Sequence, residues 1–584
     1  MMRQKFNKTS VWPSTLLLTL GTLVFGPSVY DVDAGDANQT PGSVIVQGPD
    51  LETVKRVVLE VGGSMTHELG IIRAVGAELT ATQRDALQGL DPSLRIYEDA
   101  GVRTSGNGGG NSRDSRGDGS DSFIEDDEPY TGNEWIWEPA TQTTPVFMLG
   151  ANLLHDEGIT GHGITVAVLD TGLLMAPQII YSNGASRILG HYDVTRNKIW
   201  QNPLRQSDDN GHGGHVSGLI VNQELHAPTG ARYGIAPEAD LVIVKAFDET
   251  GQGTYSDVIA GIDWIVQNKD AYGIRVLNLS FSAPPRSYYW DDPLNQAVMA
   301  AWQAGIAVVA SAGNLGPEPM TIGAPGNVPY IITVGAMSDN FTPEVGGDDV
   351  LASFSSAGPT VEAFIKPEVV APGGHVVSTM GWWTDIASSH HDYHDGGDYF
   401  VMSGTSQAAA IVSGVAALML QVDPALSPDD LKCRLMASAR PAVTPEGTLA
   451  YTVFQQGTGM IGAYDAVHST AAGCANLGLD IDLDLAGLEH YAGLARQAED
   501  GTFHILGPDG FVWSDGFVWS DGFVWSDGFV WSDGFVWSDG FVWSDGFVWS
   551  DGFVWSDGFV WSDGFVWSDA LTEPASINVW VEQE

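Results

Sequence analysis

The stretch Gly163-Ile164-Thr165-Val166-Ala167-Val168-Leu169-Asp170-Thr171-Gly172 decides the fold of this chain. It is a near-continuous apolar run that stops at a carboxylate, which is typical of a buried strand. Similar runs recur over 241–246, 276–281, 307–310 and 331–334, and residues 257–268 between them carry apolar residues at helical spacing behind a possible N-cap, Ser256. Buried strands that alternate with helices predict an α/β fold of three layers with a mainly parallel central sheet.

Asp170 ends its strand at the edge of the sheet where open α/β proteins bind ligands. Two distant motifs supply partners for it: Gly211-His212-Gly213-Gly214-His215 and Ser403-Gly404-Thr405-Ser406-Gln407. A carboxylate, an imidazole and a hydroxyl are the groups that make serine a nucleophile, and the chain order Asp, His, Ser is one of those known for this geometry. Ser406 also opens a helix of small residues, so its backbone N–H can donate to an oxyanion.

A fourth motif, Ala310-Ser311-Ala312-Gly313-Asn314, follows a buried strand. The Asn314 amide at that strand end can give the oxyanion a second hydrogen bond. Single motifs have other readings. Asp-Thr-Gly also occurs in aspartic proteases, which need two copies where this chain has one, and His212 with His215 has the spacing of a metal pair but lacks the Glu of a zinc-protease helix.

Together these motifs resemble the subtilisin-like serine proteases (subtilases), with a peptidase domain over 145–472. The resemblance extends to four more stretches, which are Val276-Leu277-Asn278-Leu279-Ser280, Ser353-Phe354-Ser355-Ser356-Ala357-Gly358-Pro359, Lys366-Pro367-Glu368-Val369-Val370-Ala371-Pro372-Gly373 and Gly457-Thr458-Gly459-Met460-Ile461. It implies an endopeptidase that acts on proteins and peptides through an acyl-enzyme. In that scheme Asp170 orients the imidazole, His212 is the base and then the acid, Ser406 attacks, and Asn314 stabilises the oxyanion.

The resemblance also implies where substrate lies. An extended peptide would pair with Gly251 and Gly253 on one side and with Ser280, Phe281 and Ser282 on the other, which is β-augmentation. The primary pocket would be lined by Ser311, Ala312, Gly313 and Gly323. Because these residues are small and Leu315 stands where some relatives carry a charge, we expect an apolar or aromatic residue before the scissile bond.

The chain departs from the family pattern near the reacting groups. Gly214 stands where Thr is usual, Gln407 where Met is usual, and Ala410 and Ile411 where Pro-His is common. None of these changes removes a catalytic atom, but they leave the local geometry open. The competing hypothesis is a surface binding or adhesion protein that uses the aromatic repeats over 510–569 and has an inactive protease-like domain.

The sequence before residue 145 is predicted to contain a leader, a small domain and a linker. Residues 1–30 resemble a signal peptide, with Arg3, Lys5 and Lys8 before an apolar stretch over 14–25 that is shorter than the ~20 residues of a membrane span. A single membrane anchor is the alternative, and no later segment reads as a span. A signal peptide predicts a secreted, extracellular protein. Residues 101–144 begin with a run rich in Gly, Asn, Ser and Asp, which predicts a flexible linker.

Residues 40–100 are predicted to form a small α+β unit. We expect strands over 43–46 and 94–97, an extended stretch over 71–79, and helices over 50–61 and 82–87. The unit resembles the ferredoxin-like propeptide of subtilases, which implies a self-processing zymogen with its own propeptide as inhibitory partner. An unrelated small domain is the alternative.

Beyond the peptidase domain lie an acidic tail (473–509), ten copies of Gly-Phe-Val-Trp-Ser-Asp (510–569) and a C-terminal tail (570–584). In the acidic tail the alternating residues 479–484 predict an edge strand with an acidic face, either solvated or metal-binding. Each repeat joins a turn signal to a strand signal. Three readings stay open for the repeats: a β-array that stacks on itself, an aromatic platform for a carbohydrate or surface partner, or a recently expanded segment with little ordered structure.

The net charge of −48 excludes nucleic acid as a natural partner, because phosphate binding needs Lys and Arg. The chemistry needs no cofactor. The acidity is compatible with structural calcium, which members of the family often bind, but no motif assigns a metal ligand. The loop His390-His391-Asp392-Tyr393-His394-Asp395 is interpreted either as metal-ligating or as a solvated specificity loop. Cys433 and Cys474 form either one disulfide or two separate thiols.

Overall fold

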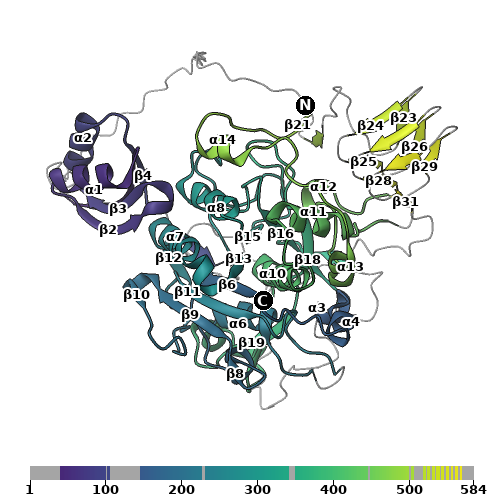
Figure 1. Ribbon diagram of the computed structural model, residues 1–584, viewed down its shortest axis with the longest axis horizontal. Coiled ribbons are helices and arrows are strands. Elements are labelled where there is room, and N and C mark those ends of the chain that lie inside the picture. The colour runs from purple at the N-terminus through teal and green to yellow at the C-terminus, as the bar shows by residue number, and fades with distance from the viewer. Residues whose placement is uncertain are drawn as a thin grey trace, which may run out of the picture.

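The computed structural model (Figure 1) describes residues 40–99, 101–104, 145–226, 230–340, 349–444, 448–498 and 502–505, together with nine short strands between 517 and 568. The predicted signal peptide, the linker from residue 105 to 144 and the C-terminal tail lie outside the described residues.

A nine-stranded sheet forms the centre of the peptidase domain. Its order is β10-β9-β11-β6-β13-β15-β16-β17, with β18 also paired to β16, and every pair is parallel except β10–β9 and β16–β17. The mainly parallel sheet is thus confirmed. The strands are β6 (Thr165–Asp170), β9 (Ile188–Asp193), β10 (Lys198–Ile199), β11 (Asp240–Lys245), β13 (Ile274–Leu279), β15 (Ala307–Ser311), β16 (Ile332–Ser338), β17 (Val350–Leu351) and β18 (Val369–Pro372).

Helices pack against this sheet and complete the layers (Figure 1). On one side α6 (His212–Val221) packs against α10 (Thr405–Val422), and on another α7 (Tyr255–Tyr272) packs against α8 (Pro293–Gln303). The cap of α7 is Thr254 rather than the predicted Ser256, because Thr254 and Asp257 form a reciprocal capping box. Further helices of this domain are α3 (Pro145–Met148), α4 (Ala151–Asp156), α5 (Pro177–Ile180), α9 (Asp385–Ser389), α11 (Pro428–Ser438), α12 (Val453–Gln456) and α13 (Ala463–His468).

One helix of the described chain, α10, is long and apolar enough to cross a membrane, which corrects the expectation that no later segment reads as a span. However, 89% of its apolar window is buried inside the protein. Its apolar character therefore reflects its packing against both the sheet and α6, where small residues such as Ala409 and Ala416 allow close packing.

The N-terminal unit has its own four-stranded sheet and core. Its elements run β1 (Gly42–Gln47), α1 (Leu51–Glu60), β2 (Ser64–Leu69), β3 (Ala74–Leu79), α2 (Ala81–Leu90) and β4 (Arg95–Glu98), and the strand order is β2-β3-β1-β4 with antiparallel pairs. This β-α-β-β-α-β order is that of ferredoxin-like units. At the start of the predicted extended stretch (71–79), residues 70–72 form a short 3-10 helix before β3 begins.

The predicted linker begins with a strand, which corrects its boundary. Residues of β5 (Gly101–Thr104) pair antiparallel with β12 (Gln252–Thr254) on one side and β14 (Phe281–Ser282) on the other. Composition did not reveal this strand, because its hydrogen-bond partners lie about 150 to 180 positions away and belong to the peptidase domain. Val102 is buried and joins the hydrophobic core of that domain.

The predicted edge strand over 479–484 is wrong. Residues Ile481–Leu485 form helix α14, which Asp480 caps by accepting hydrogen bonds from the N–H groups of Asp482 and Leu483. Asp484 is buried and accepts hydrogen bonds from the hydroxyls of Tyr289 and Tyr330, at 2.5 and 2.9 Å. The acidic residue that alternation placed on a solvated face therefore anchors the tail to the peptidase domain.

The repeats form parallel strands related by 18 residues, or three repeats. They assemble into three sheets, β23-β26-β29, β24-β27-β30 and β25-β28-β31, with identical residues in register. This arrangement agrees with the first reading, an array that stacks on itself. The strands are β23 (Phe517–Ser520), β24 (Phe523–Ser526), β25 (Phe529–Ser532), β26 (Phe535–Ser538), β27 (Phe541–Ser544), β28 (Phe547–Ser550), β29 (Val554–Ser556), β30 (Val560–Ser562) and β31 (Val566–Ser568).

The two cysteines form one disulfide, Cys433–Cys474, whose Cα atoms are 5.2 Å apart. It connects α11 to the segment that follows α13. The pairing decides the question that sequence left open, because only the fold fixes the distance between the two side chains.

Candidate active site

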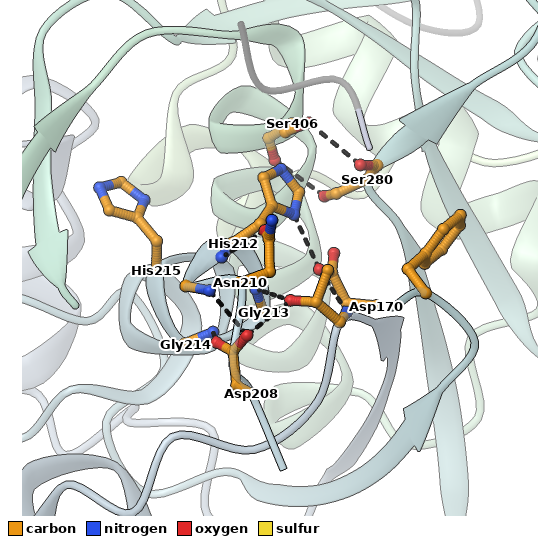
Figure 2. Close-up of polar contacts among 12 residues, drawn as sticks. Asp170, Asp208, Asn210, His212, Gly213, Gly214, His215, Ser280 and Ser406 are labelled. Atoms are coloured by element: carbon orange, nitrogen blue, oxygen red, sulfur yellow. Dashed lines mark hydrogen bonds and ion pairs between the residues drawn. The ribbon is translucent and has the colours of Figure 1, made fainter. Parts of the chain in front are cut away.

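The first pair of the site joins β6 to α6. His212 Nδ1 lies 2.7 Å from Asp170 Oδ1, and both side chains are buried (Figure 2). Asp170 is the last residue of β6 and His212 the first of α6, so the sheet edge and the helix start bring them together. The contact fixes the ring and leaves Nε2 on its other side. Within the described part of the chain, Nε2 is buried without a hydrogen-bond partner.

Ser406 enters the same space from the start of α10, and Figure 2 shows the His212 ring between Asp170 and Ser406. Its Oγ donates to the carbonyl of Ser280 at 3.1 Å, and Ser280 Oγ donates back to the carbonyl of Ser406 at 2.9 Å. In this structure Ser406, the candidate nucleophile, is thus hydrogen-bonded to the segment predicted to pair with substrate. Hydrogen bonds of a resting active site often form fully only when substrate binds.

Asn314, the predicted oxyanion donor, is held by Thr405. Its Oδ1 accepts from the Thr405 backbone N–H at 3.0 Å and from Thr405 Oγ1 at 2.8 Å. Because the amide oxygen is fixed on Thr405, the Nδ2 donor is turned away from it. Sequence reasoning selected Asn314 but missed Thr405, the residue next to Ser406 that orients the amide.

Asp208 is a supporting residue that sequence reasoning also missed. It is fully buried, and it accepts hydrogen bonds from Thr171 Oγ1 (2.8 Å), Gly211 N (2.8 Å) and Gly214 N (2.7 Å) (Figure 2). Burial raises the pKa of its carboxyl, although these donors act in the opposite direction. A carboxylate four residues before a helix-starting His is the sequence signal that could have found it, since acids favour helix N-termini.

The structure explains two of the departures from the family pattern. A Cβ on Gly214 would lie 2.7 Å from the Cβ of Leu174, so the leucine fills the place of the usual side chain. Gln407 Nε2 approaches His215 Nδ1 at 3.5 Å, while His215 Nε2 is 3.1 Å from the carbonyl of Phe400. Burial lowers the pKa of His215 to about 3, and the neutral ring can satisfy both contacts.

The predicted substrate-binding strands face each other across β5. Gly253 of β12 pairs with Val102, Ser282 of β14 pairs with Arg103, and Phe281 pairs with Thr104. Gly251, in the turn before β12, has a φ of +74°, a conformation that glycine adopts without strain. The chain's own segment therefore occupies the groove into which a peptide was predicted to pair.

The predicted pocket residues also lie together. Gly323 N donates to the carbonyl of Ala312 at 3.0 Å, and Ser311 Oγ donates to the carbonyl of Phe281 at 3.0 Å. Ser282 Oγ lies close to both Gly313 and Gly323. The two predicted walls are thus neighbours, and a serine hydroxyl stands between them.

No cluster of metal-ligating residues is found among the described residues. In the loop over 390–395, His394 is buried, and its Nε2 lies 3.0 Å from the carbonyl of Met380 while its Nδ1 accepts from Gly396 N at 3.0 Å. Both nitrogens of His394 are thus engaged by backbone groups, which favours a structural role for this histidine.

An α/β sheet that brings Asp170, His212, Ser406 and Asn314 to one edge defines a hydrolase of the serine nucleophile class. Comparison with known proteins is consistent with this class. The model of the subtilase family matches residues 161–460. The chain is 40% identical over 283 residues to serine protease AprX of Bacillus subtilis, covering 48% of this chain and 61% of AprX. It is 33% identical over 303 residues to subtilisin DY of Bacillus licheniformis, covering 51% of this chain and 92% of that protein.

The chain belongs to the subtilase family, and its catalytic domain is that of a subtilisin-like serine endopeptidase. Among solved structures it resembles fervidolysin of Fervidobacterium pennivorans, described as a keratinolytic enzyme related to subtilisin. The TM-score is 0.56 at 22% identity, over 81% of this chain and 68% of that chain. This likeness supports the fold.

Proposed function

We propose that this chain is a secreted serine endopeptidase made as a self-inhibited precursor, with Asp170, His212, Ser406 and Asn314 as its catalytic residues. The observation that carries the proposal is the position of β5. It lies between β12 and β14 in the groove beside Ser406, and it comes from the chain itself. An extended segment held there by two strands has the geometry of a bound polypeptide.

In the proposed reaction His212 Nε2 takes the proton of Ser406 Oγ as the oxygen attacks the peptide carbonyl. The new C–O bond forms as the carbonyl oxygen becomes an oxyanion, which Asn314 Nδ2 and the Ser406 backbone N–H stabilise. The C–N bond then breaks, and His212 returns the proton to the leaving amine. Water, activated in the same way, releases the acyl group from Ser406. No cofactor takes part in these steps.

Contacts between the two domains support an inhibitory role for the N-terminal unit. Asp99 Oδ1 accepts from the N–H of Ser256 in the first turn of α7 at 2.9 Å, where a helix favours negative charge. Asp263, further along α7, accepts from Gly70 N at 2.8 Å. Figure 1 shows the N-terminal unit beside α7. The unit and the strand β5 that follows it therefore lie on one face of the peptidase domain.

The test of the catalytic proposal compares the full chain with Ser406→Ala. We expect the unaltered chain to release the 40–104 region and to hydrolyse casein, and the variant to do neither while remaining folded by circular dichroism. Asp209→Asn, which alters an exposed carboxylate near His212, serves as the control and should process normally. Release of the region by Ser406→Ala purified free of other proteases would exclude this mechanism.

Export rests on the signal-like residues 1–30 and on a disulfide, which suits an oxidising compartment. N-terminal sequencing of the protein from culture medium would locate both processing sites.

Structural calcium is proposed from the acidity and the family, and a lower melting temperature in a chelator would support it. The repeats are proposed to bind a surface or carbohydrate partner.

The rival idea of an adhesion protein with an inactive domain is less favoured, because the Asp170–His212 contact is intact.

A further inference from the structure

The side chain of Ser282 lies in the predicted primary pocket. A Cβ built on Gly323 would lie 1.9 Å from Ser282 Oγ, so the hydroxyl occupies the position that a side chain on Gly323 would take. A Cβ built on Gly313, on the facing wall, would lie 3.0 Å from the same oxygen. The Ser282 hydroxyl therefore stands between the two glycines whose lack of side chains had suggested a deep pocket.

Backbone hydrogen bonds fix the strand that carries Ser282. Ser282 is the last residue of β14, and it pairs with Arg103 of β5. The next residue, Ala283, exchanges two backbone hydrogen bonds with Ala324, at 2.8 and 2.9 Å. These bonds hold the strand that carries Ser282 against the segment that carries Gly323, so the walls cannot separate without breaking them.

We propose that Ser282 restricts the residue before the scissile bond to small side chains, with alanine and serine accepted and phenylalanine disfavoured. This inference rests on the proposed endopeptidase function. An aromatic ring would need the space that the hydroxyl occupies, and packed interiors do not absorb such volume without displacing their neighbours. The expectation of a large apolar residue at this position stays untested, and the placement of Ser282 argues against it.

The sequence after β5 fits a small-residue preference. The three residues that follow Thr104 are Ser105, Gly106 and Asn107. A self-processing cut soon after β5 would therefore follow a small residue rather than an aromatic one. A precursor whose own cleavage sequence suited a large pocket would be expected to carry a large residue there.

The experiment uses the full chain after self-processing and two peptide substrates that differ only in alanine or phenylalanine before the cleaved bond. For the unaltered protein we expect kcat/KM to be at least ~10-fold higher with alanine, the scale of discrimination that small volume differences produce in such pockets. In Ser282→Gly we expect the ratio of kcat/KM with phenylalanine to kcat/KM with alanine to rise ~10-fold.

The matched control is Ser287→Gly, five positions along, whose exposed hydroxyl donates to the carbonyl of Tyr288. It should leave both values unchanged. If Ser282→Gly fails to fold, Ser282→Ala removes the same hydroxyl and keeps Cβ. The cleavage sites of the unaltered protein in casein, identified by mass spectrometry, test the preference without any variant.

Two results would overturn the inference while leaving the endopeptidase intact: a preference of the unaltered protein for phenylalanine, or a ratio that Ser282→Gly and Ser282→Ala do not change. A folded, processed protein that hydrolyses neither the peptides nor casein would instead overturn the proposed function, and the inference with it. A preference for small residues that Ser282→Gly relaxes would support both.

Discussion

Thr405 holds the side-chain amide of Asn314 with two hydrogen bonds, one from its backbone N–H at 3.0 Å and one from its hydroxyl at 2.8 Å. Thr405 precedes the proposed nucleophile, so the same turn that presents Ser406 also orients the proposed oxyanion donor. This coupling places the two groups in a fixed relation before substrate arrives, which is the condition for electrostatic stabilisation of a transition state.

The first prediction concerns that donor. Asn314→Ala should lower kcat about 10²–10³-fold with little change in KM, the effect that loss of the corresponding amide has in subtilisin. Thr405→Val keeps the backbone N–H bond to Asn314 but removes the hydroxyl, which donates to Asn314 Oδ1 and accepts from Gly313 N, and it should have a smaller effect in the same direction. Steady-state kinetics on one peptide substrate would measure both. A kcat within a factor of two of the unaltered enzyme would argue against an oxyanion role for Asn314.

Asp208 should act as a positioning residue for His212. Asp208→Asn turns an amide N–H₂ toward one of the two backbone donors, Gly211 N or Gly214 N, and should lower the free energy of unfolding by about 1–3 kcal/mol. We expect kcat to fall while KM holds, because α6 carries His212 and no bond to substrate is lost. Asp209→Asn is the control. If Asp208→Asn lost the predicted stability but kept an unchanged kcat, Asp208 would have a structural role only.

His215 should make the protein sensitive to acid. Its folded pKa of about 3 lies below the ordinary 6.5, so the unfolded chain binds a proton between pH 6.5 and 3 that the folded chain does not. Stability from this residue is therefore complete above pH 6.5 and falls as pH drops through that window, by up to about 1.4 kcal/mol per pH unit. In a Ser406→Ala background, His215→Gln should flatten the dependence of denaturation midpoint on pH. Parallel curves for the two proteins would contradict this.

The disulfide should stabilise the end of the peptidase domain. Cys433 and Cys474 close a loop across a sequence separation of 41, which corresponds to about 3–4 kcal/mol in the chain-entropy description. The double variant Cys433→Ser, Cys474→Ser should lose up to that amount in denaturant unfolding of the Ser406→Ala protein. Adding a reductant to the unaltered protein should give a similar loss and should have no effect on the double variant.

Deletion of residues 510–569 should leave kcat/KM on small peptides unchanged. The repeat strands pair only with one another in the described chain, whereas the proposed catalytic residues lie on the central sheet and its helices. Binding of the full chain and of the deletion to an insoluble polysaccharide would show whether the repeats contribute adhesion. A folded deletion protein without peptidase activity would show that the two functions are not separable.

Much of the catalytic domain was predictable because its signals are local. Strand β6 and helix α7 were visible as apolar periodicity, and the motifs around Asp170, His212 and Ser406 carry side chains whose chemistry is fixed by residue type. Asn314 was selected for the same reason, as an amide at the end of a buried strand. These inferences needed no knowledge of which segments meet.

Other features depended on contacts between distant segments, and the sequence alone could not supply them. The alternation over 479–484 suits a strand or a short helix, and only the tyrosines that bind Asp484 distinguish a buried anchor from a solvated edge. β5 looked like linker because its partners lie in another domain. Ser282 was assigned from sequence to the strand that pairs with substrate, and its position between Gly313 and Gly323 depends on the backbone pairing of Ala283 with Ala324.

The sequence by itself thus determined the parallel α/β architecture and the identity of the proposed reacting groups, because periodicity and side-chain chemistry are properties of short stretches. The tertiary structure alone decided the joining of Cys433 to Cys474, the pairing of β5 within the proposed substrate groove and the position of Ser282 in the proposed primary pocket. The physical reason is that bond formation, strand pairing and steric volume depend on distances between residues far apart in the chain, and packing of the whole core sets those distances.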